Sequence, residues 1–306
     1  MRALFFNADA PHRLEFGVAP QPVPRPHEVI VDNVAVSLNF GEVAFHTPGP
    51  GPRTVLGWDS AGVVSRAAAD GTGPPVGARV VTFGWQGGWA ERRAVATNDL
   101  AVVPASLDLG ATSALPVAGV TALQALRRLG PVAGRRVLVT GASGGVGRFA
   151  VQLGARAGAH VIASVGSEAR GRGLTQLGAA EVIVDVEDLS TPVFGLLDTV
   201  GGPQLATLLG KLEPGGIVQW IGRASRESLI LEVPRIEQHA PWRLEHFTVT
   251  TPFGPDLETL IALLAADDLD SNIGWRGPWD SAADAAEALI DRKVNGKAVL
   301  DIARAI

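Results

Sequence analysis

Residues 137–147 read Val-Leu-Val-Thr-Gly-Ala-Ser-Gly-Gly-Val-Gly, and this stretch decides the fold. Its first residues are aliphatic or β-branched, a composition that predicts a buried strand. From Gly141 to Gly147 a glycine then stands at every third position, with one more glycine between them. Residues 148–157 predict a helix, which Gly158 can end. A strand, a glycine-rich turn and a helix N-terminus in this order are typical of a unit that binds a dinucleotide.

Glycine suits this turn for physical reasons. It adopts left-handed backbone conformations at little cost, and its lack of a Cβ atom allows the backbone to approach a pyrophosphate closely. The helix that follows presents unpaired backbone N–H groups and a partial positive charge to the phosphates. We therefore predict that the turn binds a dinucleotide through Gly141, Ser143, Gly144, Gly145, Val146 and Gly147.

The composition of the 306-residue chain narrows the classes of function. Its length suggests two domains, and its net charge of -5 offers no basic surface to nucleic acid or to an anionic membrane. No apolar run approaches the ~18 residues that span a bilayer, and the first residues lack the apolar core of a signal peptide, so we expect a cytoplasmic protein. The chain contains no cysteine, which excludes disulfides, thiol catalysis and cysteine-bound zinc.

The pattern of predicted elements changes near residue 115. Residues 1–115 hold short β-type runs between glycines and prolines, which predicts a compact β-rich domain or barrel. Residues 116–253 alternate strands with helices, which predicts a doubly wound parallel sheet. Residues 254–306 hold two helices and a last strand, which we expect to return to the first domain. The strands predicted for the second domain are 137–140, 160–165, 181–184, 195–200, 216–221 and 247–250, and a helix is predicted over 168–177.

Motifs spread over nearly the whole chain resemble the medium-chain dehydrogenase/reductase superfamily. Within it, the chain is similar to the zinc-independent quinone oxidoreductase and enoyl reductase branch. The resemblance implies an α/β fold, with a Rossmann-type doubly wound parallel sheet and a β-rich GroES-like substrate domain. The matching stretches are residues 34–40, 56–64, 76–81, 87–91 and 115–122, the glycine turn, and residues 198–202, 212–216 and 295–297.

At the positions where zinc-dependent relatives carry their metal ligands, the residue types of this chain argue against a metal. Zinc-dependent relatives place a cysteine near position 37 and a histidine in a Gly-His-Glu motif, where this chain has Gly57-Trp58-Asp59. An indole offers no lone pair to zinc. We therefore expect no metal, and we expect hydrogen bonds to polarise the substrate carbonyl.

The residues after the second parallel strand indicate which nicotinamide cofactor binds. NAD sites usually carry an acidic residue about 20 positions beyond the last glycine of the turn, where this chain has Ser167. Glu168 follows, but at a helix start it is better explained as a partner of the helix dipole. Ser167 and Arg170 can hold a 2′-phosphate by hydrogen bond and charge, which favours NADPH. The alternative is that Arg170 and Arg172 are solvated helix residues.

Four more residues are expected to contact the cofactor. Gly222 ends a strand at the carboxyl edge of the parallel sheet, where ligands bind. The resemblance implies further contacts from Thr121, and from Asn295 and Lys297 in the Asn-Gly-Lys motif.

The resemblance implies that a hydride moves from the nicotinamide to a quinone or to the β-carbon of an α,β-unsaturated carbonyl compound. The protein then positions both partners and stabilises the charge that develops. Asn39 stands where relatives keep an asparagine near the nicotinamide and the substrate carbonyl, and Glu42 is predicted to orient this site. His46 is a candidate proton donor. The alternatives are a turn asparagine, an exposed carboxylate and a solvated histidine, with water as the proton source.

Three tryptophans are the candidates for substrate binding, namely Trp58, Trp85 and Trp89. Two of them lie in a glycine-rich stretch, and their flat apolar rings suit a planar or conjugated substrate by offset stacking. Ordinary packing in the core or between domains is the alternative.

Together, these patterns predict an NADPH-dependent, zinc-independent reductase of quinones or α,β-unsaturated carbonyl compounds. A reductase dedicated to one natural-product intermediate is an alternative, and so is a non-catalytic NADPH-binding structural or sensor protein. The resemblance also implies a homodimer, formed by edge-to-edge pairing of the strand predicted near 247–250. We expect a small-molecule substrate and no nucleic-acid or membrane partner.

Overall fold

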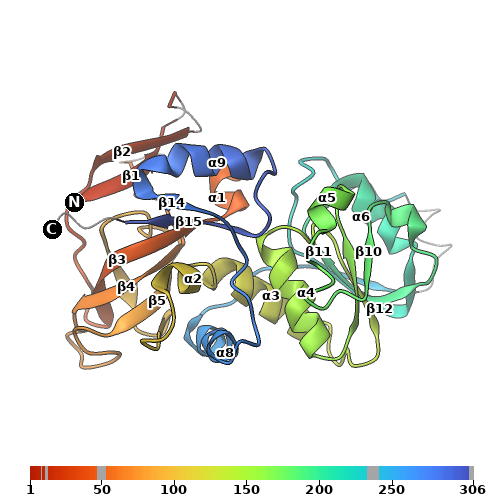
Figure 1. Cartoon of the computed structure of the whole chain (residues 1–306), viewed down its shortest axis with the longest axis horizontal. Coiled ribbons are helices and arrows are strands. Elements are labelled where there is room, and N and C mark those ends of the chain that lie inside the picture. Colours follow the sequence, from red (N-terminus) through yellow and green to blue (C-terminus); the bar gives the residue numbers. More distant parts are fainter. Residues whose placement is uncertain (8, 11–12, 47–52, 233–240, 303–306) are drawn as a thin grey trace. The chain divides into compact units, whose positions relative to one another are not determined.

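The computed structural model describes residues 1–7, 9–10, 13–46, 53–232 and 241–302. The chain divides into two compact units. In Figure 1 the first unit contains the red to yellow and the blue segments, and the second contains the green to cyan segments. Unit 1 comprises Met1–Val120 and Thr250–Ile306, and unit 2 comprises Thr121–Val249. The predicted boundaries, after residues 115 and 253, lie a few residues from these divisions.

Unit 2 is built on a six-stranded sheet in which every neighbouring pair of strands is parallel. The strand order is β10-β9-β8-β11-β12-β13, so the direction of winding reverses between β8 and β11, where doubly wound sheets bind their ligands. The predicted doubly wound parallel sheet is confirmed. Its strands are β8 (Arg136–Val139), β9 (His160–Ser164), β10 (Glu181–Ile183), β11 (Val193–Asp198), β12 (Leu212–Trp220) and β13 (Arg243–His246).

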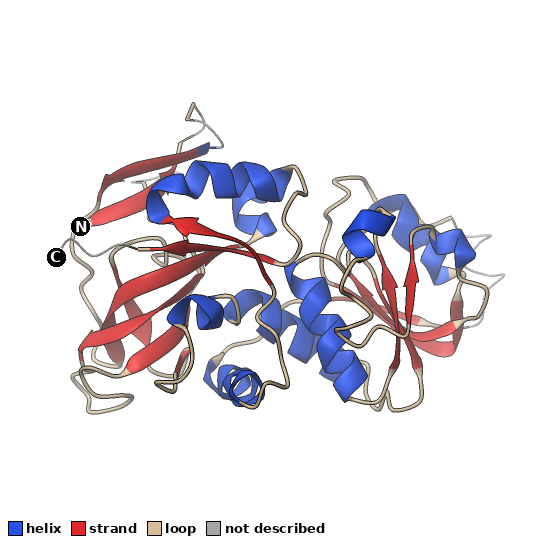
Figure 2. Cartoon of the chain, in the orientation of Figure 1, coloured by secondary structure: helices blue, strands red, loops and turns tan. Residues whose placement is uncertain are grey.

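Helices cover this sheet, as Figure 2 shows, and the central strands β8, β9 and β11 are accordingly mostly apolar and buried. Helix α4 (Gly145–Arg156) starts directly after the glycine turn and packs on β8 and β9. Helix α6 (Gly202–Leu209) buries its leucines in a core with Leu138 and Leu196 of the sheet. The shorter elements of unit 2 include α5 (Glu168–Gly171) and the 3-10 helix η2 (Val186–Asp188).

Strand β3 (Glu28–Leu38) is the central strand of unit 1. Along its 11 residues it pairs antiparallel with β4, β6 and β15. The larger sheet has the order β14-β15-β3-β4-β5-β7, and β1 pairs with β2 in a separate sheet. The strands are β1 (Arg2–Phe6), β2 (Leu14–Val18), β4 (Asp59–Arg66), β5 (Arg79–Phe83), β6 (Arg92–Ala96), β7 (Leu100–Val102), β14 (Ile273–Pro278) and β15 (Lys297–Asp301).

The C-terminal part of the chain completes this sheet of unit 1. Strand β15 pairs antiparallel with β3, β14 pairs parallel with β15, and α9 (Ala282–Ile290) packs on both, as Figure 1 shows in blue. One apolar core joins Leu4, Val36 and Trp89 of the N-terminal part with Ala286 and Leu300 of the C-terminal part. Other helices of unit 1 are α1 (Phe40–Phe45), α2 (Leu109–Ser113), α8 (Gly254–Ala265), η3 (Trp279–Ser281) and the start of α3 (Pro116–Arg128).

Two predicted elements of unit 2 were wrong in their bounds. The last strand of the sheet is not 247–250 but β13, because its register is set by β12, which ends at Trp220 opposite His246. The helix predicted over 168–177 ends at Gly171, since Gly173 adopts a φ of 81° that a helix cannot contain. Strands β2 and β14 were not predicted at all.

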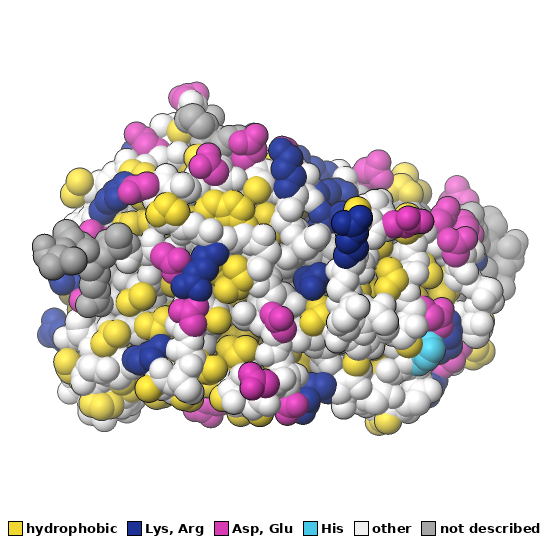
Figure 3. All heavy atoms as spheres, viewed as in Figure 1, with side chains coloured by type: hydrophobic (Ala, Val, Ile, Leu, Met, Phe, Trp, Pro, Cys, Tyr) yellow, Lys and Arg dark blue, Asp and Glu magenta, His cyan; other side chains and the backbone are white. Residues whose placement is uncertain are grey.

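Both Lys and Arg side chains and Asp and Glu side chains are exposed on the face drawn in Figure 3. Among the helices in the described parts of the chain, none is long and apolar enough to cross a membrane.

Candidate active site

A buried polar cluster lies at the C-terminal end of β3 in unit 1. It consists of Asn39, Glu42, Asp59 and Lys297, each at most 8% exposed. Asn39 follows β3 and Glu42 lies in the first turn of α1, while Asp59 begins β4 and Lys297 begins β15. Strand pairing brings the four residues together, because β4 and β15 flank β3 on its two edges.

The ammonium group of Lys297 is fully engaged inside this cluster. Its Nζ donates to Asn39 Oδ1 at 2.6 Å and to the Leu38 carbonyl at 3.1 Å, and it lies 3.2 Å from Asp59 Oδ2. These bonds use the three donors that an ammonium has. The structure therefore places Lys297 among the residues that shape unit 1, and its predicted cofactor contact stays a prediction.

Asp59 accepts hydrogen bonds on both carboxylate oxygens. Oδ2 accepts from Ser37 Oγ at 3.0 Å and from Asn39 Nδ2 at 2.8 Å, in addition to Lys297. Oδ1 accepts from the backbone N–H of Val117 at 3.1 Å, in the first turn of α3. Each of these neighbours donates to the carboxylate, and Lys297 forms an ion pair with it.

Asn39 is held in place at both ends of its side-chain amide. Oδ1 accepts from Lys297, and Nδ2 donates to Glu42 Oε2 and to Asp59 Oδ2, each at 2.8 Å. Its backbone N–H also donates to Glu42 Oε2, at 3.0 Å, which anchors the start of α1. The predicted contact between Asn39 and a substrate carbonyl stays a prediction, and in this structure the amide is bound within the cluster.

Burial, with the nearby Asp59 charge, raises the pKa of Glu42 to about 8. Hydrogen bonds from Asn39 and from the Trp58 backbone N–H, and the Lys297 charge, act in the opposite direction without offsetting these causes. A proton on Glu42 leaves the cluster with one carboxylate, Asp59, and one ammonium group, Lys297. This charge balance explains how the cluster is tolerated in the interior.

His46 lies directly after α1, with its ring 5.0 Å from that of Phe6. Burial lowers the pKa of His46, which favours the neutral imidazole. Its role as a proton donor stays a prediction.

The three predicted substrate tryptophans differ in their surroundings. Trp89 is completely buried and donates from Nε1 to the Ser37 carbonyl at 3.1 Å, so core packing accounts for it. Trp58 and Trp85 instead form an edge-to-face pair, with ring centroids 5.7 Å apart. Trp85 is 58% exposed, and the Trp58 ring passes 3.4 Å from the position a Cβ would take on Gly41 in α1. Of the three tryptophans, only Trp58 and Trp85 are accessible to solvent, and their contact with a substrate stays a prediction.

In unit 2 the glycine turn has the geometry that its sequence predicts. Gly141 has a φ of 59°, Gly144 is the N-cap of α4, and a side chain on Gly147 would collide with the Gly141 carbonyl. Thr121, Gly145 and Val146 also lie within helices here, in α3 and the first turn of α4. The turn thus brings backbone N–H groups of a helix N-terminus to the carboxyl end of β8.

Arg170 extends from α5 to this turn. Its Nε donates to Ser143 Oγ at 2.9 Å, and Ser167 is the N-cap of the same short helix. Ser167 and Arg170, the two residues predicted to bind a 2′-phosphate, therefore belong to the same short helix, and Arg170 contacts the glycine turn.

Buried polar groups support the neighbouring strand end. Asp198, at the end of β11, accepts from Thr140 Oγ1 at 2.6 Å and from the Gly201 N–H at 2.8 Å, and burial raises its pKa. Gly222 packs against the backbone that follows β11, so closely that a Cβ on it would be 2.5 Å from the Thr199 carbonyl oxygen. Asn295 lies in unit 1, next to Gly296, which has a φ of 98°.

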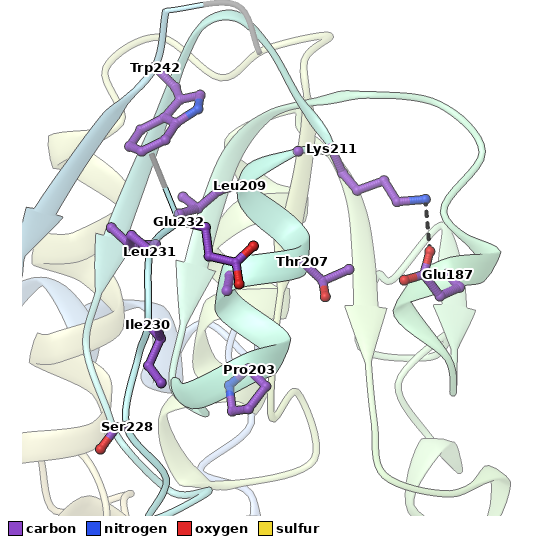
Figure 4. Close-up of a pocket in the computed structure, with 12 residues that line it drawn as sticks. Glu187, Pro203, Thr207, Leu209, Lys211, Ser228, Ile230, Leu231, Glu232 and Trp242 are labelled. Atoms are coloured by element: carbon purple, nitrogen blue, oxygen red, sulfur yellow. Dashed lines mark ion pairs between the residues drawn. The ribbon is translucent and has the colours of Figure 1, made fainter. Parts of the chain in front are cut away.

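One pocket in unit 2, of about 470 Å³, lies apart from all of these predicted residues. Figure 4 shows its lining from α6, η2 and the stretch that follows β12, with Trp242 at one end and the Lys211–Glu187 ion pair at the other. None of the residues predicted from the sequence lines it. Within the described residues, His, Asp and Glu form no group of three or more that could hold a metal.

A glycine turn at the switch point of a doubly wound sheet, joined to a β-rich unit, is the architecture of a dinucleotide-dependent dehydrogenase or reductase. Two family profiles match the chain. The alcohol dehydrogenase GroES-like domain matches residues 25–105, and the family described as zinc-binding dehydrogenase matches residues 177–300. The chain belongs to the medium-chain dehydrogenase/reductase superfamily, in its quinone oxidoreductase and enoyl reductase branch.

Individual relatives support this assignment. An acrylyl-CoA reductase of Ruegeria pomeroyi is 32% identical over 226 residues, which are 65% of this chain and 68% of that protein. A trans-enoyl reductase of Aspergillus flavipes is 35% identical over 161 residues, 45% of this chain, and the match spans about half of that protein's length, 47%.

Solved structures share the whole fold. A quinone oxidoreductase of Pseudomonas syringae superposes with a TM-score of 0.89 at 25% identity, covering 98% of this chain and 99% of that one. A quinone oxidoreductase of Escherichia coli, solved in complex with NADPH, has a TM-score of 0.87 at 23% identity over the same shares of the two chains. The β-rich unit is therefore GroES-like, as the resemblance implied.

Sequence reasoning missed Asp59 as the centre of the polar cluster. It considered this residue only as part of the motif that replaces the zinc site. Asp59 lies two residues before the strand predicted over 61–65, between Trp58 and Ser60, so no apolar alternation in the sequence marks it as an inward position of a strand.

We predict that Lys297→Met lowers the free energy of unfolding by about 3 to 5 kcal/mol, because it leaves the Asp59 carboxylate buried without its cation. Urea denaturation measures this loss. The matched control is Lys293→Met, since Lys293 is an exposed lysine of the same unit paired only with Asp291, and it should cost less than about 0.5 kcal/mol. Equal losses in the two variants would contradict the role given to Lys297.

We also predict that Glu42 makes stability depend on pH. Its pKa is about 8 in the folded chain against 4.5 ordinarily, so between these values the folded chain holds a proton that the unfolded chain releases. The free energy of unfolding therefore falls as the pH rises through this window, by at most about 1.4 kcal/mol per pH unit. Urea denaturation of the wild type and of Glu42→Gln, at steps from about pH 5 to 9, should show the extra slope only in the wild type. Parallel curves would exclude the raised pKa.

Proposed function

We propose that the chain is an NADPH-dependent reductase that transfers a hydride to a quinone or an α,β-unsaturated carbonyl compound. The observation that carries the proposal is the glycine turn at the switch point of the sheet, in a chain of the quinone oxidoreductase and enoyl reductase branch. The relatives named above reduce enoyl compounds or quinones according to their names. This chain belongs to the same branch, and its glycine turn is the element that we propose binds the dinucleotide.

The residues of unit 2 fit a phosphorylated dinucleotide. The N-terminus of α4 and the turn from Gly141 to Gly147 would hold the pyrophosphate, with Thr121 and Gly222 as further contacts. The guanidinium group of Arg170, with the hydroxyl groups of Ser143 and Ser167, would hold the 2′-phosphate. NADPH, when bound, supplies the hydride, and Asn295 is proposed as one more contact.

The residues of unit 1 would bind and orient the acceptor. The Trp58–Trp85 pair would stack against a planar or conjugated substrate, and Trp89 would support it only as part of the core. The polar cluster would hold α1 and Trp58 in place, since Glu42 accepts from the Trp58 N–H. We propose that hydrogen bonds polarise the carbonyl without zinc, because Trp58 stands where zinc-dependent relatives have a ligand. His46 or water would supply the proton.

Two alternatives remain in the proposal. The engagement of the Asn39 amide within the cluster favours a non-catalytic NADPH-binding protein, because both hydrogens of this amide are already bound there. A reductase dedicated to one natural-product intermediate is the narrower alternative. Turnover on a panel of acceptors separates these possibilities.

We also propose a homodimer that pairs through β13, the edge strand of the parallel sheet, in the cytoplasm. Edge strands present unpaired backbone groups that a second copy can extend. Analytical ultracentrifugation of the chain should give twice the monomer mass, and a monomeric mass would contradict the pairing.

The test of the proposed function is a titration with NADPH and NADH, followed by NADPH oxidation with 9,10-phenanthrenequinone and a panel of small enones. We expect tight NADPH binding with turnover on at least one acceptor. Binding without turnover would favour the non-catalytic or dedicated alternatives, and a preference for NADH would contradict the reading of Ser167 and Arg170.

The same titration tests Arg170. We predict that Arg170→Ala weakens NADPH binding about tenfold and leaves NADH binding unchanged, because only NADPH carries the 2′-phosphate. The control is Arg135→Ala, since Arg135 precedes β8 at the end opposite the glycine turn and pairs with Glu213. An equal loss of affinity for both nucleotides in Arg170→Ala would contradict the assignment.

A further inference from the structure

Arg93 is a buried charge of unit 1 that the polar cluster does not include. It lies in β6 and is 2% exposed. Burial lowers its pKa to about 10, so the guanidinium group is still charged at neutral pH. The charges of Asp59 and Asp99 favour this charged state. A buried guanidinium group needs hydrogen-bond acceptors around it, so its acceptors show which segments of the chain it connects.

The guanidinium group binds the backbone of two segments that each carry a tryptophan. Nη1 donates to the Trp58 carbonyl at 3.0 Å, and Nη2 donates to the Gln86 carbonyl at 3.0 Å. The hydroxyl groups of Ser60 and Thr82 complete the contacts of Nη1, at 3.3 and 3.2 Å. Arg93 thus links the residue that carries one indole to the residue directly after the other, Trp85.

The segment around Trp85 is shaped by this guanidinium group. A side chain on Gly84 would collide with Nη2 of Arg93, so glycine at this position leaves room for the guanidinium group. The Gly84 N–H donates to the Trp58 carbonyl at 3.0 Å, the same oxygen that Arg93 binds. The two tryptophan segments are therefore joined directly and through Arg93.

The backbone N–H and the backbone carbonyl of Trp58 are each bound by a buried ionisable side chain. Its carbonyl accepts from Arg93, and its N–H donates to Glu42 Oε1 at 2.6 Å. A continuous chain of hydrogen bonds consequently runs from the polar cluster, through the Trp58 backbone and Arg93, to the carbonyl that follows Trp85. Trp85, the residue before that carbonyl, has an indole that is 58% exposed.

We propose that Arg93 is a positioning residue that fixes the Trp58–Trp85 pair and thereby sets the preference for planar, conjugated acceptors. This proposal rests on the proposed function, in which the pair stacks on the substrate. Without the guanidinium group, the Gln86 and Trp58 carbonyls lose their common donor, and the edge-to-face geometry at 5.7 Å loses its support. An acceptor that needs no stacking surface should be indifferent to this change.

The first arm of the test is spectroscopic and does not require activity. The reference signal is the difference between the near-ultraviolet circular dichroism spectra of the wild type and of Trp85→Phe. Arg93→Met should lose most of the same signal. Arg79→Met is the matched control, because Arg79 also lies on a strand of unit 1 and donates to the carbonyls of Ala105 and Leu107, with no tryptophan among them. It should retain the signal.

The second arm is kinetic. In Arg93→Met, the KM for 9,10-phenanthrenequinone should rise up to about tenfold, the worth of a well-placed aromatic contact, while kcat stays within about twofold. The KM for methyl vinyl ketone, which is small and acyclic, should stay within about twofold of wild type. Arg93→Lys keeps the charge and part of the hydrogen bonding, so it should restore part of the signal and of the KM.

The outcomes are distinguishable from failure of the proposed function. If the wild type turns over no acceptor, the proposed function fails, and the dichroism of Arg93→Met and Arg93→Lys still decides whether Arg93 fixes the pair. A retained signal in Arg93→Met would overturn the proposal. A KM that rises equally for the quinone and the acyclic enone would overturn its claim on specificity.

Discussion

The buried contact between the Lys297 ammonium and the Asp59 carboxylate is the interaction on which unit 1 depends. Either charge alone would be strongly disfavoured in the interior, where water cannot solvate it. Together they bind the first residues of β4 and β15 to the end of β3, and Asp59 also accepts from the N-terminal turn of α3. One carboxylate therefore sets the mutual positions of three strands and a helix.

The two units use the same physical device at different sites. In unit 2, Asp198 ends a strand, is buried, and accepts from Thr140 and from a backbone N–H of the next turn. In unit 1, Asp59 begins a strand, is buried, and accepts from Ser37 and from a backbone N–H of α3. Each carboxylate thereby links a strand end to the turn or helix beside it, near a proposed ligand site, and fixed positions of this kind are what a preorganised site requires.

The sequence was informative where the physics is local. The glycine turn, the strand before it and the helix after it follow from about twenty consecutive residues, because steric permission and helix-terminal N–H groups act over short distances. The order of strands and helices likewise predicted the doubly wound sheet. The alternation of short apolar runs with glycine and proline was enough to indicate the β-rich unit.

The sequence was less informative where distant residues meet. Lys297 was grouped with the cofactor residues by its motif, whereas its ammonium lies against Asn39, 258 positions away. Nothing in the spacing could reveal that contact, since it arises from the pairing of β15 with β3. The bounds of β13 failed for a related reason, because register is decided by the partner strand and not by the β-propensity of the segment itself. Arg93 was not singled out from the sequence, and its burial and its contacts appear only in the structure.

The pairing of β15 with β3 has a consequence for how the chain is made. On the ribosome, β3 and Asp59 emerge long before Lys297, and the whole of unit 2 is synthesised between them. Unit 2 is continuous in sequence, so it can fold first, while the edge of β3 and a carboxylate without its cation wait for the last strand. The sheet of unit 1 therefore stays incomplete until synthesis has passed β15.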